Sequence, residues 1–213
     1  HPFPGPGLAV RVLCPEKADY PQNSADLEKK LSEVVLNYGC KVKVLPIKSV
    51  GVQGDERTYK HPAVIFGKQI SWEDANKLST QLTNRFPEIN RVLLGLTPAS
   101  FDKLDIQKTY LTPERISILQ KADKIVMDYI KEVGIDKDIW QFPTVLIPVC
   151  VNGSTAESLV LRPVCSQEAM TANFYQMDFD KLGELVKRLS ALEKIGAIFY
   201  DITNKPPGTI EWE

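Results

Sequence analysis

The residues best suited to chemistry lie in the final segment of the chain, residues 204–213, which read NKPPGTIEWE. Chain ends are usually polar and poorly ordered, whereas this tail carries a cation, two prolines and a tryptophan between glutamates. Lys205, followed by the backbone N–H groups from Gly208 onward, could cradle a phosphate. Glu211 could accept two hydrogen bonds from a ribose diol. The alternative is a docked terminal strand whose Trp212 fills a groove, and physical considerations alone favour this alternative slightly.

The two consecutive prolines set the expected shape of the tail. Pro206 and Pro207 restrict the backbone and remove two hydrogen-bond donors. We therefore expect Lys205 and the residues that follow it to be extended and stiff rather than coiled.

Two further polar stretches could bind a ligand. In VGVQGDERTY, residues 50–59, the glycines allow close backbone approach, and Asp55 and Arg57 project on one side if the stretch is extended. In IWQFPTVL, residues 139–146, Gln141 lies just before an apolar strand, and its amide can donate and accept. Taken alone, the first is more often a solvated loop and the second a satisfied structural amide.

Composition excludes several classes of protein. The 213 residues include 26 basic and 27 acidic side chains, mixed along the chain, with a net charge of −1. This balance disfavours a nucleic-acid partner, which needs a cationic surface. No apolar run approaches the roughly 20 residues that span a bilayer. From the sequence we expect a cytoplasmic protein that can bury a substantial core.

The sequence offers no self-sufficient catalytic centre. The phosphate-binding, dinucleotide-binding, nucleophile-elbow and zinc-protease motifs are absent. Its two histidines, His1 and His61, have no second ligand at metal-binding spacing. The four cysteines are scattered, mostly in strand-like runs, and are interpreted as reduced, largely buried thiols. We therefore expect no catalytic residue and no metal in this chain.

The chain begins with a connector. HPFPGPG, at residues 1–7, has the prolines and glycines of an extended, non-helical segment. The alternation in LAVRVLC, residues 8–14, predicts a strand. We assign 1–23 to connector and first strand, and expect the chain to be a piece of a longer protein because it does not start with methionine.

The rest of the chain repeats one order of elements. A helix from Ser24 is followed by two strands, a helix beginning at Ser71 and a strand near 90–96. After a helix with Thr112 as N-cap, the same order of two strands, a helix and a strand returns at 144–203. This β-β-α-β duplication predicts an α+β fold, α/β-like, with two tandem subdomains at 24–110 and 111–213, each a small sheet covered by helices.

Three segments together resemble a known family. HPFPGPG, SVGVQGDERTY and YDITNKPPGTIEWE resemble the carboxy-terminal dimerisation domain of GMP synthetase, the glutamine-hydrolysing ligase that converts XMP to GMP. The resemblance covers essentially the whole chain. The order and spacing are similar to the longer form of the domain, in which the α/β unit occurs twice.

The resemblance implies a role within a larger enzyme. In the family an amidotransferase domain frees ammonia from glutamine, and an ATP-pyrophosphatase domain adenylates the xanthine ring before ammonia displaces AMP. Neither domain is present in these residues, so ATP and Mg²⁺ would be bound elsewhere and this part alone would not make GMP. The alternative hypothesis for the function is a non-enzymatic α/β module that senses a nucleotide or joins subunits.

The resemblance also implies which residues meet XMP. Lys205 matches the family's phosphate-binding lysine, Glu211 the ribose-binding glutamate, and Gln141 the glutamine near the base. Asp55 matches another aspartate of the XMP site. The weaker candidates are Arg57 and the backbone of Ile210.

One departure from the family and one consequence of the duplication remain open. Many relatives carry an arginine just before the last strand, where this chain has Ala197. Either the phosphate is held less tightly, or another cation such as Lys194 substitutes. Relatives with one α/β unit pair it with a second subunit, whereas a tandem copy could satisfy that surface within one chain, so a homodimer is left open.

Overall fold

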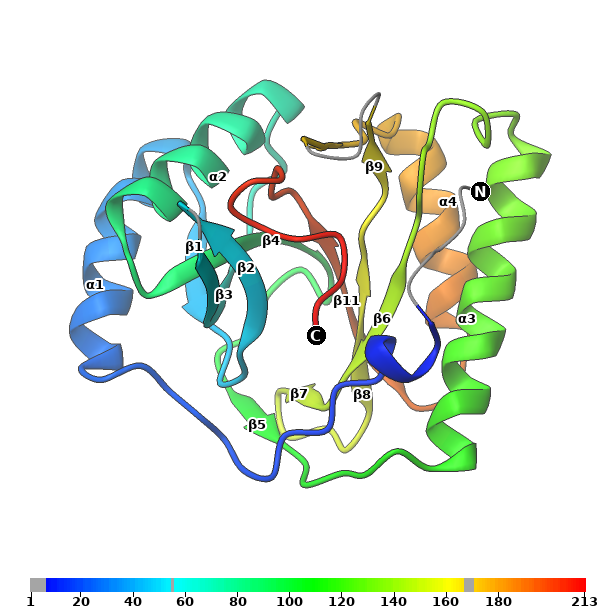
Figure 1. Cartoon of the computed structure of the whole chain (residues 1–213), viewed down its shortest axis with the longest axis horizontal. Helices are drawn as coiled ribbons and strands as arrows, with labels where there is room; N and C mark the ends of the chain where they lie inside the picture. Colours follow the sequence, from blue (N-terminus) through cyan, green and yellow to red (C-terminus); the bar gives the residue numbers. More distant parts are fainter. Residues whose placement is uncertain (1–6, 55, 167–170) are drawn as a thin grey trace.

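The computed structural model describes residues 7–54, 56–166 and 171–213, and places four α-helices beside one large mixed sheet (Figure 1). The order of strands in the sheet is β1-β3-β4-β11-β8-β6, and β2 pairs with β3 beside this path. Its strands are β1 (Lys41–Val44), β2 (Ser49–Gln53), β3 (Glu56–Phe66), β4 (Ile89–Thr97), β6 (Thr144–Ile147), β8 (Glu157–Leu161) and β11 (Ile195–Asp201). Two short ribbons complete the strands: β5 (Leu104–Ile106) with β7 (Val149–Val151), and β9 (Val164–Cys165) with β10 (Asn173–Phe174).

The helices begin where the sequence predicts. α1 (Ser24–Val35) ends through a short 3-10 turn at Gly39, whose φ is +74°. α2 (Trp72–Arg85) is capped by Ser71, whose Oγ accepts from Asp74 N at 3.1 Å. α3 (Pro113–Glu132) and α4 (Phe179–Ser190) are capped in the same way by Thr112 and Asp178. Among the described residues no helix has the length and apolar character needed to cross a bilayer.

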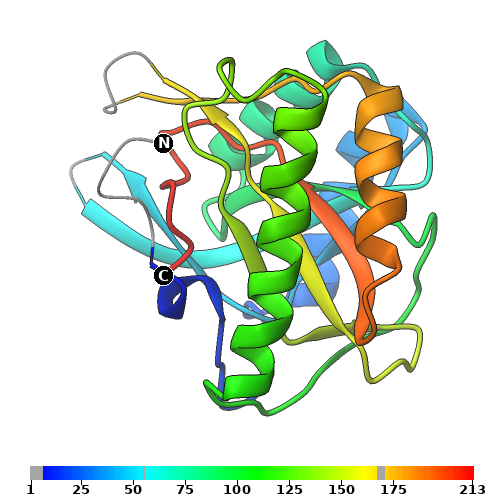
Figure 2. The same ribbon diagram turned by 90° about the vertical axis from the view of Figure 1, so that its right-hand side faces the viewer.

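All four helices pack on one face of the sheet. Alternate residues of a strand point to opposite faces, so Ala63 and Ile65 of β3 join the core formed by the helices, while Val64 and Phe66 join a second core with Trp212 of the tail. Figure 2 shows α3 and α4 on one side of the strands and the C-terminal tail on the other. The tail therefore lies on the face that the helices leave open.

The two predicted repeats are joined by their last strands. In the first copy β1 pairs antiparallel with β3, and β3 parallel with β4; in the second β6 pairs antiparallel with β8, and β8 parallel with β11. The strands β4 and β11 then pair with each other, antiparallel. The two copies thus form one pseudo-symmetric sheet whose centre is the β4–β11 pair.

The predicted α+β class is confirmed, but two details are wrong. The copies do not form separate small sheets, because β4 and β11 would each be an unprotected edge and instead pair with each other. The strand predicted at 8–14 is a 3-10 helix, Ala9–Arg11, followed by a single bridge from Val12 to Leu146. The boundary between residues 110 and 111 stays a prediction.

Candidate functional site

The tail leaves β11 through a turn rather than an extended segment. Gly208 N–H donates to Asn204 O at 3.0 Å, and the peptide bonds before Pro206 and Pro207 are cis. The expectation that the residues after Lys205 are extended is therefore wrong at this turn. The Gly208 N–H is also engaged within the turn and is not available for a phosphate.

Beyond the turn the tail is docked firmly. The Trp212 side chain is only 1% exposed and packs in the core on the open face of the sheet. Its Nε1 donates to Asp201 Oδ2 at 3.1 Å, and the Arg91 guanidinium lies 5.0 Å from its ring centroid. The predicted docking of the tail with a buried Trp212 is thus confirmed, but the tail is not a strand, since it forms only isolated bridges at Lys205 and Gly208. A docked tail can still bind a ligand, because the contacts of Trp212 hold its neighbours, such as Glu211, in fixed positions.

The tail of the second copy is held by the hairpin of the first. We use hairpin for β2 and the part of β3 that pairs with it, residues 49–53 and 56–60. Gly51 forms an antiparallel bridge with Gly208, Val50 N donates to Trp212 O at 2.9 Å, and Val52 N donates to Pro207 O at 2.7 Å. The two glycine-containing motifs noted in the sequence therefore meet, and the candidate site is built from both copies.

Beneath the tail lies a buried cluster of charges. The Asp201 carboxylate lies 2.9 Å from Arg91 Nη1 and 3.0 Å from Arg162 Nη1, and all three side chains have no exposed area. Burial lowers the pKa of both guanidiniums, and the Asp201 charge opposes that shift. The charge of Glu211 on the tail also acts on both guanidiniums and, like that of Asp201, raises their pKa.

The cluster also bears on which cation could replace the arginine that many relatives carry at the position of Ala197. Lys194 precedes the start of β11 and forms an ion pair with Glu114, whereas the tail follows the end of that strand. The idea that Lys194 substitutes for the missing arginine is therefore wrong. The guanidiniums near the tail come from Arg91 on β4 and from Arg162, directly after β8.

The predicted phosphate and ribose residues lie on the docked tail. Lys205 pairs through its backbone with Ala172, with N···O distances of 2.7 and 3.1 Å, and is half-buried. Glu211 is exposed, and its backbone oxygen accepts from Arg91 Nη2 at 2.6 Å. Ile210 is 4% exposed and packs against Val164 and its neighbours. Lys205 and Glu211 thus both lie on the tail segment that leads to the buried anchor Trp212.

Gln141 lies beside the same ribbon. It forms an antiparallel bridge with Val164, and its side chain is only 6% exposed. Its Oε1 is buried and has no hydrogen-bond partner among the described residues. The two predictions for Gln141, a structural amide and a ligand contact, both stay predictions. A buried acceptor without a partner is costly unless a ligand or water supplies a donor.

Of the two candidate residues predicted in the stretch VGVQGDERTY, the structure describes only Arg57. Arg57 is exposed and lies opposite Val52 in the hairpin. Asp55 lies outside the described residues. The structure thus brings Gln141, Lys205 and Ile210 to the β9–β10 ribbon, with Arg57 on the neighbouring hairpin.

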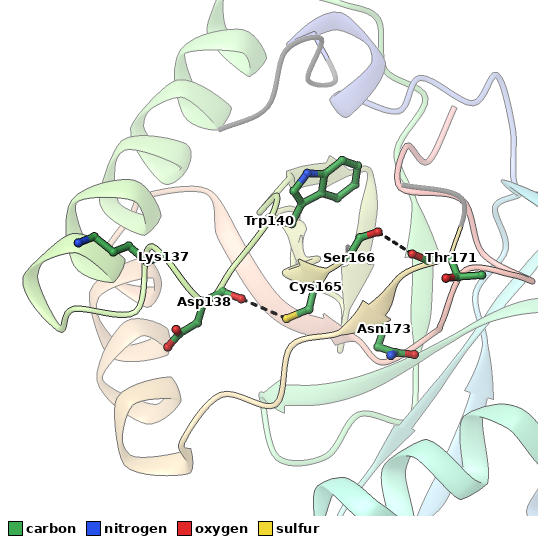
Figure 3. Close-up of a pocket in the computed structure, with 7 residues that line it drawn as sticks. All are labelled: Lys137, Asp138, Trp140, Cys165, Ser166, Thr171 and Asn173. Carbon is green, nitrogen blue, oxygen red and sulfur yellow. Dashed lines mark hydrogen bonds between the residues drawn. The ribbon is translucent and has the colours of Figure 1, made fainter. Parts of the chain in front are cut away.

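Next to this ribbon is a cavity of about 550 Å³ (Figure 3). Trp140 precedes Gln141, and Thr171 and Asn173 flank Ala172, the backbone partner of Lys205. The cavity is lined by Lys137, Asp138, Trp140, Cys165, Ser166, Thr171 and Asn173. Sequence reasoning missed these residues, although the aromatic next to Gln141 was a usable signal.

The cysteines are not suited to nucleophilic chemistry. All four are free thiols. Burial raises the pKa of Cys40 and Cys165, and raises that of Cys150 to about 11. A thiol with a raised pKa is a poor nucleophile. The described residues also contain no group of three His, Cys, Asp or Glu side chains arranged to hold a metal ion.

The contact between hairpin and tail predicts the effect of a small substitution. A Cβ at Gly51 would lie 2.7 Å from Pro207 O and 2.9 Å from Asn90 Nδ2. We expect Gly51→Ala to lower the free energy of unfolding by about 1–3 kcal/mol, because backbone atoms must move apart. Gly183→Ala is the control, since its Cβ would meet no atom within 4 Å and alanine favours the helix. Chemical denaturation of both variants tests this, and equal stability of the two would contradict it.

Comparisons with known proteins define the class of domain. Residues 128–212, which lie mostly in the second copy, match the family model described as the GMP synthase C terminal domain. The whole chain is 41% identical over 215 residues to a probable glutamine-hydrolysing GMP synthase of Leptospira interrogans, and covers 35% of its length. It is 29% identical over 259 residues to the GMP synthase of Dictyostelium discoideum, with 99% of this chain and 36% of that protein covered. A match to the enzyme of Bradyrhizobium diazoefficiens, 43% identical over 110 residues, covers 48% of this chain and 20% of that protein.

The chain belongs to the GMP synthase C-terminal domain family and aligns with the C-terminal part of glutamine-hydrolysing GMP synthases. It spans about a third of the length of the relatives that it matches along its whole length. The resemblance noted in the sequence is thereby confirmed at the level of the family.

Proposed function

We propose that this chain is the part of a glutamine-hydrolysing GMP synthase that binds XMP and joins the domains of the enzyme. In this proposal the whole enzyme uses ATP and glutamine to convert XMP to GMP. The chain contributes binding groups rather than catalytic ones, and ATP and Mg²⁺ are bound by another domain of the same polypeptide. The chain alone is then not competent for the reaction.

The observation that carries the proposal is the arrangement of the tail. Lys205 and Glu211 are held on a docked segment, and beside the same ribbon Gln141 has a buried Oε1 with no hydrogen-bond partner among the residues that the structure describes. A cation, an exposed carboxylate and an amide suit the phosphate, the ribose hydroxyls and the base of a purine nucleotide, respectively.

The buried charges support the same ligand. Arg91 and Arg162 lie under the tail, and a buried charge is screened less than an exposed one. A dianionic phosphate near Lys205 would be attracted by these guanidiniums, whose charges are balanced in the free chain by Asp201 and Glu211. The proposal also includes Asp55, Arg57 and the backbone of Ile210 among the XMP-binding groups.

The fold also bears on assembly. The antiparallel β4–β11 pair joins the two copies within one chain. This pairing supports an internal assembly of the two α/β units in place of a homodimer.

The proposal predicts the effect of removing the Lys205 charge. In the intact enzyme we expect Lys205→Ala to raise the apparent KM for XMP by roughly ten- to a hundredfold, because a charge-assisted hydrogen bond contributes about 1.5–3 kcal/mol. Steady-state kinetics with varied XMP measures this. Lys30→Ala is the matched control, since Lys30 is an exposed lysine on α1 whose partner is Asp26. An unchanged XMP dependence in Lys205→Ala would remove Lys205 from the site.

A further inference from the structure

The register of the central strands shows which residues of the two copies correspond. The antiparallel pairs are Leu93 with Asp201, Leu94 with Tyr200, and Gly95 with Phe199. The parallel pairs of the two copies fix the correspondence, because Pro62–Arg91 and Ile65–Leu94 in the first copy match Ser158–Ala197 and Leu161–Tyr200 in the second, with a register shift at the same place. Arg91 of β4 therefore corresponds to Ala197 of β11, and Asp201 of β11 corresponds to Gly95 of β4.

Each copy has kept one member of an ion pair that spans the centre of the sheet. Arg91 is present in the first copy and Asp201 in the second, and they meet at 2.9 Å. The corresponding residues of the opposite copies, Ala197 and Gly95, carry no charge. The chain thus holds one such ion pair, and it lies on the side where the tail is docked.

We infer that Arg91 of the first copy is a positioning residue for the substrate site carried by the tail of the second copy. This inference rests on the proposed binding of XMP by the tail. Arg91 has no exposed area, so it acts through the segments that it holds and not by touching the ligand.

The hydrogen bonds of Arg91 reach two segments at the site, the hairpin and the tail. Its Nε donates to Ser49 Oγ at 3.1 Å, and its Nη2 to Val50 O at 2.9 Å, both on the hairpin. On the tail, Nη2 donates to Thr209 Oγ1 at 2.9 Å and to Glu211 O at 2.6 Å. The backbone position of Glu211 is therefore set by a guanidinium from the other copy.

The planar guanidinium is suited to this task. Its donors form a rigid fork that can bind several acceptors at once, and it stacks on aromatic rings, as Arg91 does on Trp212. A lysine has one mobile ammonium group and would reach only some of these acceptors. We therefore expect Arg91→Lys to retain part of the function and Arg91→Met to lose it.

Arg91 can be replaced without leaving a buried charge unpaired. In Arg91→Met, Asp201 still pairs with Arg162 at 3.0 Å, so the buried cluster becomes neutral. The matched control combines Arg115→Met with Glu157→Gln and is called Arg115→Met below. Arg115 is also a buried arginine, 6% exposed and paired with Glu157 at 2.7 Å, its printed hydrogen bonds reach neither hairpin nor tail, and the second substitution leaves no buried charge unpaired. Thr209→Val is a milder second variant, which removes the hydroxyl that Arg91 binds.

The test combines a local and a functional measurement. Amide hydrogen exchange of Val50 and Val52 in this chain reports the hairpin–tail contact directly, because these amides donate to Trp212 O and Pro207 O. We expect exchange to be at least about tenfold faster in Arg91→Met, intermediate in Arg91→Lys and Thr209→Val, and unchanged in Arg115→Met. In the intact enzyme we expect the apparent KM for XMP to rise roughly tenfold in Arg91→Met, with a smaller change in kcat.

The outcomes separate this inference from the proposed function. If the exchange of Val50 and Val52 is the same in Arg91→Met as in the unaltered chain, or if Arg115→Met raises KM as much, Arg91 has no positioning role. If turnover of the unaltered enzyme does not depend on XMP, the proposed function fails, while the exchange data still decide whether Arg91 holds the tail.

Discussion

Replacing Asp201 with alanine is expected to lower the free energy of unfolding by about 3–5 kcal/mol. The substitution removes the buried carboxylate that pairs with both Arg91 and Arg162, and leaves only the exposed Glu211 as a nearby negative charge. It also removes the acceptor of Trp212 Nε1 and of Thr203 N. Because burial already lowers the pKa of both guanidiniums, the charged pair cannot be tolerated once the carboxylate is gone. Urea denaturation followed by tryptophan fluorescence and circular dichroism measures the effect.

An exposed ion pair provides the comparison for Asp201. Glu132 accepts from Arg188 Nη1 at 2.6 Å on the surface of the helices. We expect Glu132→Ala to cost less than about 1 kcal/mol, since solvent screens exposed pairs. If Asp201→Ala were no more destabilising than Glu132→Ala, the buried cluster would not be what holds the tail.

Removal of residues 204–213 is expected to abolish XMP-dependent turnover of the intact enzyme, with a loss of at least about a thousandfold. The deletion takes away Lys205 and Glu211, two charged groups that would each contribute about 1.5–3 kcal/mol to nucleotide binding. It also uncovers the Arg91–Asp201–Arg162 cluster. Turnover at saturating ATP and glutamine, with XMP varied, is the measurement. Undiminished turnover would end the proposal.

A second variant separates binding from folding in that experiment. The double substitution Lys205→Ala and Glu211→Ala leaves the anchor Trp212 and its contacts in place. We expect this variant to unfold at nearly the same denaturant concentration as the unaltered chain but to bind XMP roughly a hundredfold more weakly or worse. Deletion of residue 213 alone is the control for a shortened chain.

Much of the fold could be predicted from local patterns. Apolar residues at helical spacing and the caps Ser71 and Thr112 located α2 and α3, and the repeated order of elements identified the duplication. The joining of the two copies at β4 and β11 could not be predicted in this way, because these strands are far apart in the sequence and their pairing depends on long-range register. The segment at 8–14 alternates like a strand but has only one bridge to a neighbour.

The candidate site was predicted in part. Lys205, Glu211 and Gln141 could be named from the resemblance, and their unusual sequence contexts drew attention to the segments that carry them. The cluster of Arg91, Arg162 and Asp201 was missed. Each of these residues lies in or directly beside an apolar strand, and a charged residue there was a signal that a buried partner must exist. The identity of that partner could not be predicted, because it depends on contacts between the two copies.

The most direct test of the central claim is a structure of the intact enzyme with XMP bound. The account predicts the phosphate within hydrogen-bond distance of Lys205 Nζ, the ribose hydroxyls at the Glu211 carboxylate and the base beside Gln141, with the tail docked against the hairpin as described. A nucleotide bound with no contact to residues 204–213 would contradict it.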